Sequence, residues 1–266
     1  MIDALLFIHW NPNPDFIAIG NFSIKWYGVL WGLSLFSVFF IEQYVFKKLN
    51  LDEEKITLAI QYVFICGLIG ARLAHIIFYQ LNFYIAHPED ILAVWKGGLA
   101  SHGGVVGAFL GLYLFSKRNK EFSIFWLLDH AVIGALLLAS LIRLGNLMNS
   151  ELYGIPTNVP WAFVFEQVDN IPRHPVVLYE SIAYFLIQIL LILLFNKYKE
   201  SKPGIYLVVF FIVIFTTRFF LEFFKEPEGN LFFDTISKTQ MLNLPFIIAG
   251  IILSYFVFDN KLRYNS

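Results

Sequence analysis

The sequence predicts an all-α integral membrane protein that crosses the bilayer about seven times and forms one polytopic domain over residues 1–266. Its composition is 58% hydrophobic and only 15% charged, whereas soluble proteins average roughly 25% charged residues. A hydrocarbon core about 30 Å thick requires about 20 apolar residues in helical form. Seven stretches come close to that length, near residues 24–46, 56–83, 99–115, 122–147, 175–195, 204–224 and 242–258.

The distribution of basic residues predicts the orientation of these spans. The side that includes the C-terminus carries eleven Lys and Arg residues: Lys47, Lys48, Lys55, Lys117, Arg118, Lys120, Lys197, Lys199, Lys202, Lys261 and Arg263. The opposite side carries five: Lys25, Lys96, Arg173, Lys225 and Lys238. By the positive-inside rule the N-terminus faces outward and the C-terminus faces the cytoplasm, which agrees with an odd number of spans.

Other features of the sequence exclude several classes of protein or site. The stretch from Met1 to Ile19 has no basic residue and no long apolar run, so it is not expected to be a cleaved signal peptide. The single cysteine, Cys66, excludes an intrachain disulfide. A net charge of −1 argues against a nucleic-acid-binding surface. The histidines show no metal-ligand spacing, and one cysteine cannot complete a thiolate site, so no metal is expected.

Ionisable residues within the predicted spans are the first candidates for function, because each costs about 2.5 kcal/mol or more at a helix centre and usually faces a cavity or a partner. Arg218 and Glu222 are four residues apart and therefore share a helix face. For this pair, a structural and a functional interpretation are equally favoured. For three others we favour pairing that holds the bundle together: His75, Asp129 and His130.

A second polar region extends from Trp95 to Gly104, where paired glycines flank His102 on both sides. Gly103, Gly107 and Gly111 form a small-xxx-small ladder, which brings membrane helices together and explains the last two glycines. It does not explain His102, whose imidazole can exchange a proton with a substrate. An isolated histidine is more often structural, but this glycine-rich setting favours a function.

A third polar region is the outward segment that begins at Arg143 and ends at Gly154, with Asn146, Asn149 and Glu151 between them. Arginine offers a planar fork for phosphate, and two amides with a carboxylate can orient hydroxyl groups. The alternative is an ordinary loop of turn-forming residues. A loop of that kind does not account for Arg143 with Glu151.

In these regions the sequence resembles the bacterial prolipoprotein diacylglyceryl transferase family. The resemblance runs from about Ile24 to Gly250, and it is specific because short fragments recur in the same order and spacing. The fragments are Lys25-Trp26-Tyr27-Gly28, Gly-x-Arg-Leu around Arg72, His-Gly-Gly at His102, Arg143 through Gly154, Pro160-Trp161, Arg173-His174-Pro175, Tyr179-Glu180, and Arg218 with Glu222. The sequence departs from the family pattern at Ala71, Ala100-Ser101, Ile142, Ser150 and Lys225, and these changes preserve the polar groups.

The resemblance implies that the chain transfers diacylglycerol from phosphatidylglycerol to the lipobox cysteine of a prolipoprotein signal peptide and releases glycerol 1-phosphate. The expected location is the bacterial inner membrane, with the site toward the periplasmic side. Membrane lipid is then a substrate, and no cofactor is expected. A transporter using the same buried charges is the alternative, but the sequence lacks the two related halves that many transporters show.

The resemblance also implies roles for individual residues. Arg143 and Arg218 are expected to bind the phosphate, with Glu222 orienting Arg218. His102 is the candidate base for the substrate thiol, and headgroup binding is its alternative role. The residues expected to bind the headgroup are Tyr27, Arg72, Asn146, Asn149, Glu151 and Gly154.

Overall fold

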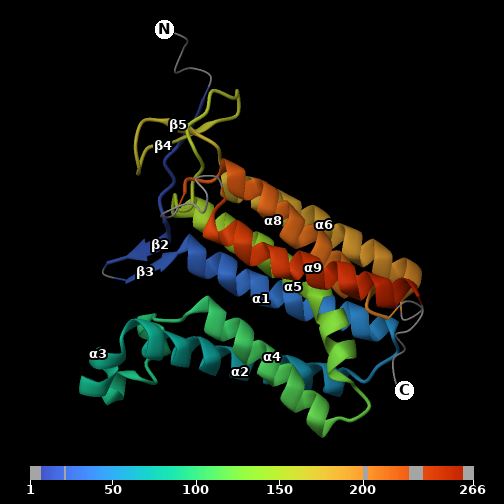
Figure 1. Ribbon diagram of the computed structural model, residues 1–266. Helices are drawn as coiled ribbons and strands as arrows, with labels where there is room; N and C mark the ends of the chain where they lie inside the picture. Colours follow the sequence, from blue (N-terminus) through green and yellow to red (C-terminus); the bar gives the residue numbers. More distant parts are fainter. Residues whose placement is uncertain (1–6, 21, 200–202, 228–235, 260–266) are drawn as a thin grey trace. The chain divides into compact units, whose positions relative to one another are not determined.

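A computed structural model describes residues 7–20, 22–199, 203–227 and 236–259 (Figure 1). Three basic residues counted in the charge balance lie outside the described residues: Lys202, Lys261 and Arg263. Contacts between Cα atoms divide the chain into two compact units. Among the described residues, one comprises those up to Glu42 together with those from Asp129 onward, and the other comprises Gln43–Leu128.

Helices make up most of the first unit. They are α6 (Val176–Tyr198), α7 (Ile205–Val209), α8 (Phe215–Leu221) and α9 (Lys238–Phe258), together with the part of α1 (Trp26–Lys48) up to Glu42 and the part of α5 (Ile124–Met148) from Asp129 onward. A π-helical turn, η3 (Phe210–Ile214), joins α7 to α8, and a 3₁₀ turn, η4 (Glu222–Phe224), follows α8. In Figure 1, α8 lies beside α9 and α6, with which it makes contacts.

Polar side chains join helices α5 and α6 within their apolar surroundings. The Ser140 hydroxyl donates to the Ser181 carbonyl at 2.9 Å, and the Ser181 hydroxyl donates to the Ser140 carbonyl at the same distance. Gln188 accepts from the Leu137 amide at 3.1 Å and donates to the Ile133 carbonyl. Hydrogen bonds of this kind hold membrane helices together where apolar burial gives no driving force.

Asp129 has the structural role expected of it. Its carboxylate accepts from the backbone amides of Gly204 at 2.7 Å and Leu207 at 2.9 Å. These amides belong to the start of α7, where the first turn of a helix leaves its N–H groups without intrahelical partners. The helix dipole is positive at this end, so it also stabilises the negative charge of the Asp129 carboxylate. Asp129, which is fully buried, therefore fixes α7 against α5.

Short strands in the first unit were not expected from the sequence. β1 (Ile8–Trp10) pairs in parallel with β4 (Phe163–Phe165), which pairs antiparallel with β5 (Pro172–Arg173). A separate hairpin consists of β2 (Asp15–Ile19) and β3 (Phe22–Lys25). Phe163 and Phe165 pack in a hydrophobic cluster with Leu147 and Val177. This cluster ties the small sheet to the end of α5 and the start of α6.

The second unit contains α2 (Glu53–Tyr79), α3 (Leu81–Ala86), α4 (Ser101–Arg118) and two 3₁₀ turns, η1 (Pro88–Asp90) and η2 (Val94–Lys96). Helices α2 and α4 cross at their glycines. A Cβ atom on Gly107 would overlap the Cys66 carbonyl oxygen, and one on Gly111 would lie 2.5 Å from the Tyr62 carbonyl oxygen. The predicted packing role of these glycines is therefore confirmed.

Six helical segments among the described residues are long and apolar enough to cross a membrane: Trp26–Lys48, Glu53–Tyr79, Ile124–Met148, Val176–Tyr198, Ile205–Phe224 and Lys238–Phe258. They match six of the seven predicted spans. The other predicted span, 99–115, corresponds to α4, whose 18 residues include His102, Lys117 and Arg118. The helical membrane fold is confirmed, and the number of crossings and the orientation of the termini stay predictions.

Candidate active site

An ion pair between α5 and α6 lies at the centre of the site in the first unit. The Nε atom of Arg143, near the end of α5, lies 2.7 Å from the Oε2 atom of Glu180, in the second turn of α6. The two side chains are only 19% and 8% exposed. A charged pair that is shielded from water is strong only with good geometry, and this one also leaves the outer guanidinium nitrogens free for other contacts.

A chain of hydrogen bonds continues from Arg143 through the predicted headgroup residues. The Nη1 atom of Arg143 donates to the Asn146 side-chain oxygen at 3.2 Å, and the Asn146 amide donates to Glu151 at 3.4 Å. The Asn149 amide donates to the other oxygen of Glu151 at 2.5 Å. Residues Ser150 and Leu152 have positive φ angles of 54° and 55°. This tight turn folds Glu151 back toward the end of α5.

Tyr27, in the first turn of α1, packs against the same part of α5. A Cβ atom added to Gly145 would lie 2.9 Å from the Tyr27 ring, so only glycine leaves room for it. The charges of Glu151 and Arg143 both act on the Tyr27 hydroxyl. The structure therefore brings together five residues predicted from the sequence: Tyr27, Arg143, Asn146, Asn149 and Glu151.

Gly154 joins three segments of the first unit. Its amide donates to the His174 carbonyl at 2.9 Å, and the next amide, of Ile155, donates to the Phe224 carbonyl at 2.9 Å. A Cβ atom on Gly154 would lie 2.5 Å from both carbonyl oxygens, so no side chain fits here. The predicted importance of Gly154 thus has a structural basis in close packing. Its contact with a lipid headgroup stays a prediction.

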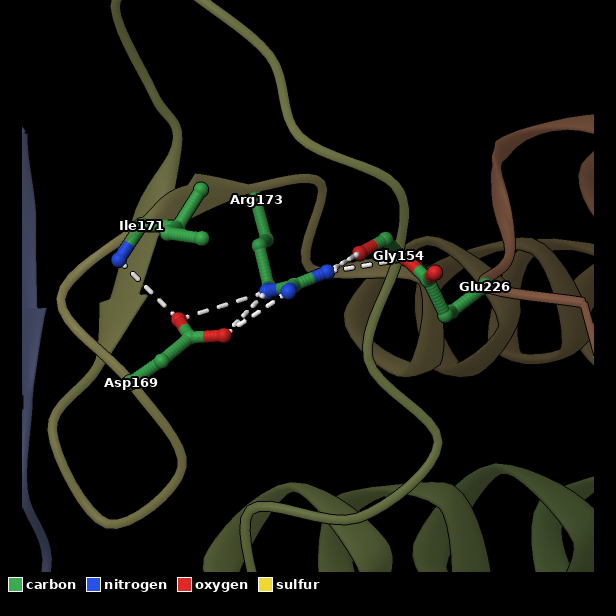
Figure 2. Close-up of polar contacts among 5 residues, drawn as sticks. All are labelled: Gly154, Asp169, Ile171, Arg173 and Glu226. Atoms are coloured by element: carbon green, nitrogen blue, oxygen red, sulfur yellow. Dashed lines mark hydrogen bonds and ion pairs between the residues drawn. The ribbon is translucent and has the colours of Figure 1, made fainter.

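Arg173 reinforces this junction (Figure 2). Its Nη2 atom lies 2.7 Å from Oδ2 of Asp169, and its Nη1 atom donates to the Gly154 carbonyl at 3.2 Å and to Glu226 at 2.8 Å. The guanidinium also lies over the Tyr153 ring, 4.9 Å from its centroid. The hydrogen bonds from Arg173 hold the pKa of the Asp169 carboxyl below its usual value. Arg173 therefore connects the loop before α6 with the segment after α8.

Within the described residues, Arg218 and Glu222 form no ion pair with each other, although their spacing places them on one helix face. Glu222 instead accepts a hydrogen bond from the Ser237 hydroxyl at 3.0 Å, and Ser237 caps the start of α9 with Gln240. Within the described residues, the Nε atom of Arg218 is buried and has no hydrogen-bond partner. Arg218 lies on α8 and Glu222 begins η4, so the four-residue spacing allowed a pair. The Glu222 carboxylate is instead bonded to Ser237, the residue that caps α9.

Tyr184 is a site residue that sequence reasoning missed. It lies four residues after Glu180, one turn further along α6, and is only 2% exposed. The charges of Glu180, Arg218 and Arg143 all act on its hydroxyl. Both predicted phosphate-binding arginines therefore lie in the surroundings of one buried tyrosine. The only sequence signal was its four-residue spacing from an ionisable residue on the same helix.

Arg72, in the second unit, makes a different set of contacts from the one expected. Its guanidinium donates to the backbone carbonyls of Asp90 and Gly97 at 2.6 Å, Ile91 at 2.8 Å, Gly98 at 2.9 Å and Ala93 at 3.5 Å. Arginine has five N–H donors, and five carbonyls accept from them. In this structure Arg72 organises the loop before α4, and its contact with a headgroup stays a prediction.

His102 also belongs to the second unit, in the first turn of α4, where its side chain is exposed. The preceding loop is fixed in place, because the Ala100 amide donates to the Ala71 carbonyl at 3.0 Å and Gly98 packs against His75. Gly98 has a φ angle of +76°, which other residues rarely adopt. The glycines thus position the start of α4, and a chemical role for His102 stays a prediction.

The described residues contain no group of three or more His, Cys, Asp or Glu side chains arranged to hold a metal ion. The polar groups of the first unit are instead arginines, amides, hydroxyls and carboxylates. Such groups bind a phosphate and hydroxyl-bearing headgroup by hydrogen bonds and charge. The site is therefore suited to an anionic, polar ligand at the end of membrane helices.

Comparison with known proteins agrees with this chemistry. A family profile described as prolipoprotein diacylglyceryl transferase matches residues 14–256. A phosphatidylglycerol–prolipoprotein diacylglyceryl transferase of Chloroherpeton thalassium is 43% identical over 256 residues, which cover 96% of each chain. Proteins of the same name from Tolumonas auensis and Bacteroides fragilis are 40% and 39% identical, covering 96% and 98% of this chain and 100% and 99% of theirs.

Proposed function

This chain belongs to the prolipoprotein diacylglyceryl transferase family, and we propose that it transfers the diacylglyceryl group of phosphatidylglycerol to the lipobox cysteine of prolipoproteins. In this reaction the cysteine thiolate attacks the glyceryl carbon that bears the phosphodiester. A C–S bond forms, the C–O bond to phosphate breaks, and glycerol 1-phosphate leaves. The observation that carries the proposal is the match to relatives over almost the whole chain, which includes every residue of the site.

The first requirement of this reaction is stabilisation of the leaving phosphate. Arg143 and Arg218 supply two positive charges around the buried Tyr184, and within the described residues Glu180 forms an ion pair with Arg143 but not with Arg218. A bound anion would pair with the Arg218 guanidinium and add to the charge balance of the site. Preorganised donors in a low-dielectric environment stabilise developing charge strongly, because they need no reorganisation during the reaction. These two arginines are the proposed phosphate-binding residues.

The second requirement is removal of the thiol proton, because the thiolate is the nucleophile. His102 is the proposed base, since an imidazole nitrogen can accept a proton and this side chain is exposed at the start of α4. Headgroup binding is the alternative role for this histidine. The transfer rate at saturating lipid distinguishes the two roles. Replacing His102 should lower that rate strongly if it is the base, and only slightly if it binds the headgroup.

The glycerol headgroup presents hydroxyls, and the hydrogen-bonded chain beyond Arg143 offers suitable partners. Asn146 and Asn149 both donate to Glu151, so the carboxylate is held in place with acceptor capacity remaining. Tyr27 borders this chain from α1. We assign these four residues to the headgroup, with Gly154 allowing the close junction behind them. Glu222 acts indirectly, by holding α9 through Ser237.

The proposed location is the bacterial inner membrane, with the site toward the periplasmic side. The charge distribution supports this location. The predicted outward segments carry fewer basic residues than the segments on the opposite side, and they contain the site residues that follow Arg143.

The experiment is transfer by purified protein in nanodiscs that contain phosphatidylglycerol, with a peptide bearing a lipobox cysteine. We expect the peptide to gain the mass of diacylglycerol in a thioether, together with one equivalent of glycerol 1-phosphate. A peptide with serine in place of the cysteine, and nanodiscs with phosphatidylcholine alone, are the controls. An unmodified cysteine peptide with folded protein would overturn the proposal.

A further inference from the structure

We propose that Tyr184 is a third phosphate-binding residue, which donates its hydroxyl proton to the phosphate held by Arg143 and Arg218. This inference rests on the proposed function, because it concerns the phosphate of the same lipid. It adds a neutral donor to a site for which the sequence offered only arginines. The ligand chemistry is a phosphate ester with its negative charge on non-bridging oxygens.

The first observation is the state of the Tyr184 hydroxyl. The side chain is 2% exposed and its hydroxyl oxygen is buried; Arg143 lies close enough to act on it as a donor, but the phenol proton has no acceptor among the described residues. Buried polar groups are nearly always hydrogen-bonded, so each exception requires an explanation. Packing alone does not supply one, because a phenylalanine would fill the same space without leaving a hydroxyl unsatisfied.

The second observation is what surrounds that hydroxyl. Arg143 and Arg218 act on it with positive charge, and arginine side chains donate hydrogen bonds but cannot accept them. The phenol proton therefore finds no acceptor on either arginine. Glu180 is the nearby carboxylate, and one of its oxygens is already paired with Arg143. An acceptor with negative charge would satisfy the phenol and match the arginines together.

The third observation is a second donor in the same condition. The Nε atom of Arg218 is also buried and without a partner within the described residues. The Tyr184 hydroxyl on α6 and the Arg218 Nε on α8 are thus two buried donors that lack acceptors among the described residues, and the charge of Arg218 acts on the Tyr184 hydroxyl. A phosphate has several acceptor oxygens and can bond to both donors and to Arg143 at once. This arrangement is what a preorganised phosphate site requires.

A second buried tyrosine in the same unit provides a contrast. Tyr206, in α7, is 0% exposed, and its hydroxyl donates to the Lys199 carbonyl. It therefore obeys the general rule that a buried phenol has a partner. Tyr206 is a matched control, because it has the same side chain and burial but no place in the proposed site.

The experiment compares Tyr184→Phe with Tyr206→Phe and wild type in detergent. Each protein is titrated with phosphatidylglycerol, with glycerol 1-phosphate and with diacylglycerol, which lacks phosphate. Hydrogen bonds to charged groups correspond to roughly a tenfold to hundredfold change in Kd. For Tyr184→Phe we expect affinity for both phosphate esters to weaken by that factor, and affinity for diacylglycerol to equal that of wild type. We also expect its ligand-free Tm to equal or exceed that of wild type.

The outcomes separate this inference from the proposed function. Unchanged affinity of Tyr184→Phe for phosphatidylglycerol overturns the role of Tyr184, whether or not the wild type transfers lipid. Equal weakening for all three ligands, together with a lower ligand-free Tm, also overturns it, because that pattern indicates a structural role. Tyr206→Phe should show the reverse pattern, a lower Tm with unchanged affinity. If Tyr184→Phe does not fold, Tyr184→His replaces it in the comparison, because histidine retains a ring with an N–H donor. Its affinity for the two phosphate esters should lie between that of wild type and the tenfold to hundredfold weaker affinity expected for Tyr184→Phe.

Discussion

The Nε atom of Arg143 lies 2.7 Å from the Oε2 atom of Glu180, and this pair joins the end of α5 to the start of α6. The contact links catalysis to stability, because the proposed phosphate-binding residue also neutralises a buried carboxylate. Removing one member of a buried pair leaves the other charge uncompensated, at a cost of about 3–5 kcal/mol. Variants of Arg143 therefore need a control that separates folding from chemistry.

We predict that Arg143→Ala nearly abolishes transfer, and that Arg143→Lys is also strongly impaired because it loses the planar fork. Arg143→Ala should also unfold at a lower temperature, since the Glu180 carboxylate is left unpaired. The double variant Arg143→Ala/Glu180→Gln should regain most of the Tm without regaining turnover. Turnover of a lipobox peptide and lipid binding are measured on the same preparations.

The result also distinguishes two roles for Arg143. If it stabilises the transition state, the turnover rate falls more than lipid affinity. Weaker lipid binding with an unchanged maximal rate would make it a headgroup anchor instead. Wild-type turnover in Arg143→Ala would remove it from the mechanism.

Most of the helical fold could be predicted, because membrane spans are long, continuous and apolar. The predicted span 24–46, for example, corresponds to Trp26–Lys48. The strands could not be predicted in this way. β1 has three residues and pairs with β4, which lies about 150 positions further along the chain, so no local pattern marks it.

The site could be predicted where its contacts are local in sequence. Asn146 lies three residues after Arg143, and Glu151 returns to it through a tight turn, so the motif brought these residues together. Tertiary pairing could not be foreseen. The carboxylate of Glu222 binds Ser237, and the donors of Arg72 bind loop carbonyls, because partners on other segments are not visible in spacing.

The packing of α2 against α4 predicts opposite outcomes for two neighbouring glycines. A Cβ atom on Gly107 would lie 2.8 Å from the Cys66 carbonyl carbon, whereas one on Gly104 would make an ordinary contact at 3.6 Å. Gly107→Ala should therefore force the helices apart and lower stability by about 1–3 kcal/mol. Gly104→Ala should have little effect. Thermal unfolding of the two variants in one detergent tests this, and equal Tm values would contradict the close crossing.

Cys66 contributes its backbone to that crossing, and its free thiol has no role in the proposed reaction. The reacting thiol belongs to the substrate. We predict that Cys66→Ala and Cys66→Ser retain most transfer activity in the peptide assay. Loss of turnover in a protein that folds normally would indicate a covalent enzyme intermediate and require a different mechanism.

The charge distribution predicts the topology of the membrane domain. In a Cys66→Ala background, a cysteine introduced at Gln167 should react with a membrane-impermeant thiol reagent added outside intact cells. A cysteine at Lys120, or a reporter fused after Ser266, should be accessible only from the cytoplasm. Both introduced positions are exposed, so burial does not prevent labelling. Labelling of both positions from one side would make the proposed orientation wrong.

The ion pair between Arg173 and Asp169 predicts a pH-dependent contribution to stability. Arg173 holds the pKa of the Asp169 carboxyl below its usual value, so the folded state favours the ionised form. The resulting stability is fully present above the unfolded-state pKa of about 3.9 and is lost as pH falls through the lower folded-state value. Asp169→Asn should therefore have a lower Tm than wild type at pH 6, and the difference should shrink below about pH 4.

Glu166→Gln is the matched control for Asp169→Asn, because Glu166 pairs with His9 at 2.8 Å on an exposed surface. Exposed pairs contribute about 0–1 kcal/mol, so this variant should resemble wild type near neutral pH. The loop that Asp169 holds also carries Arg173, which bonds to the Gly154 carbonyl at 3.2 Å. Asp169→Asn should thus reduce transfer several-fold at pH 7 through the position of Gly154. A Tm difference that stays constant down to pH 3 would show that Asp169 acts through packing rather than through its charge.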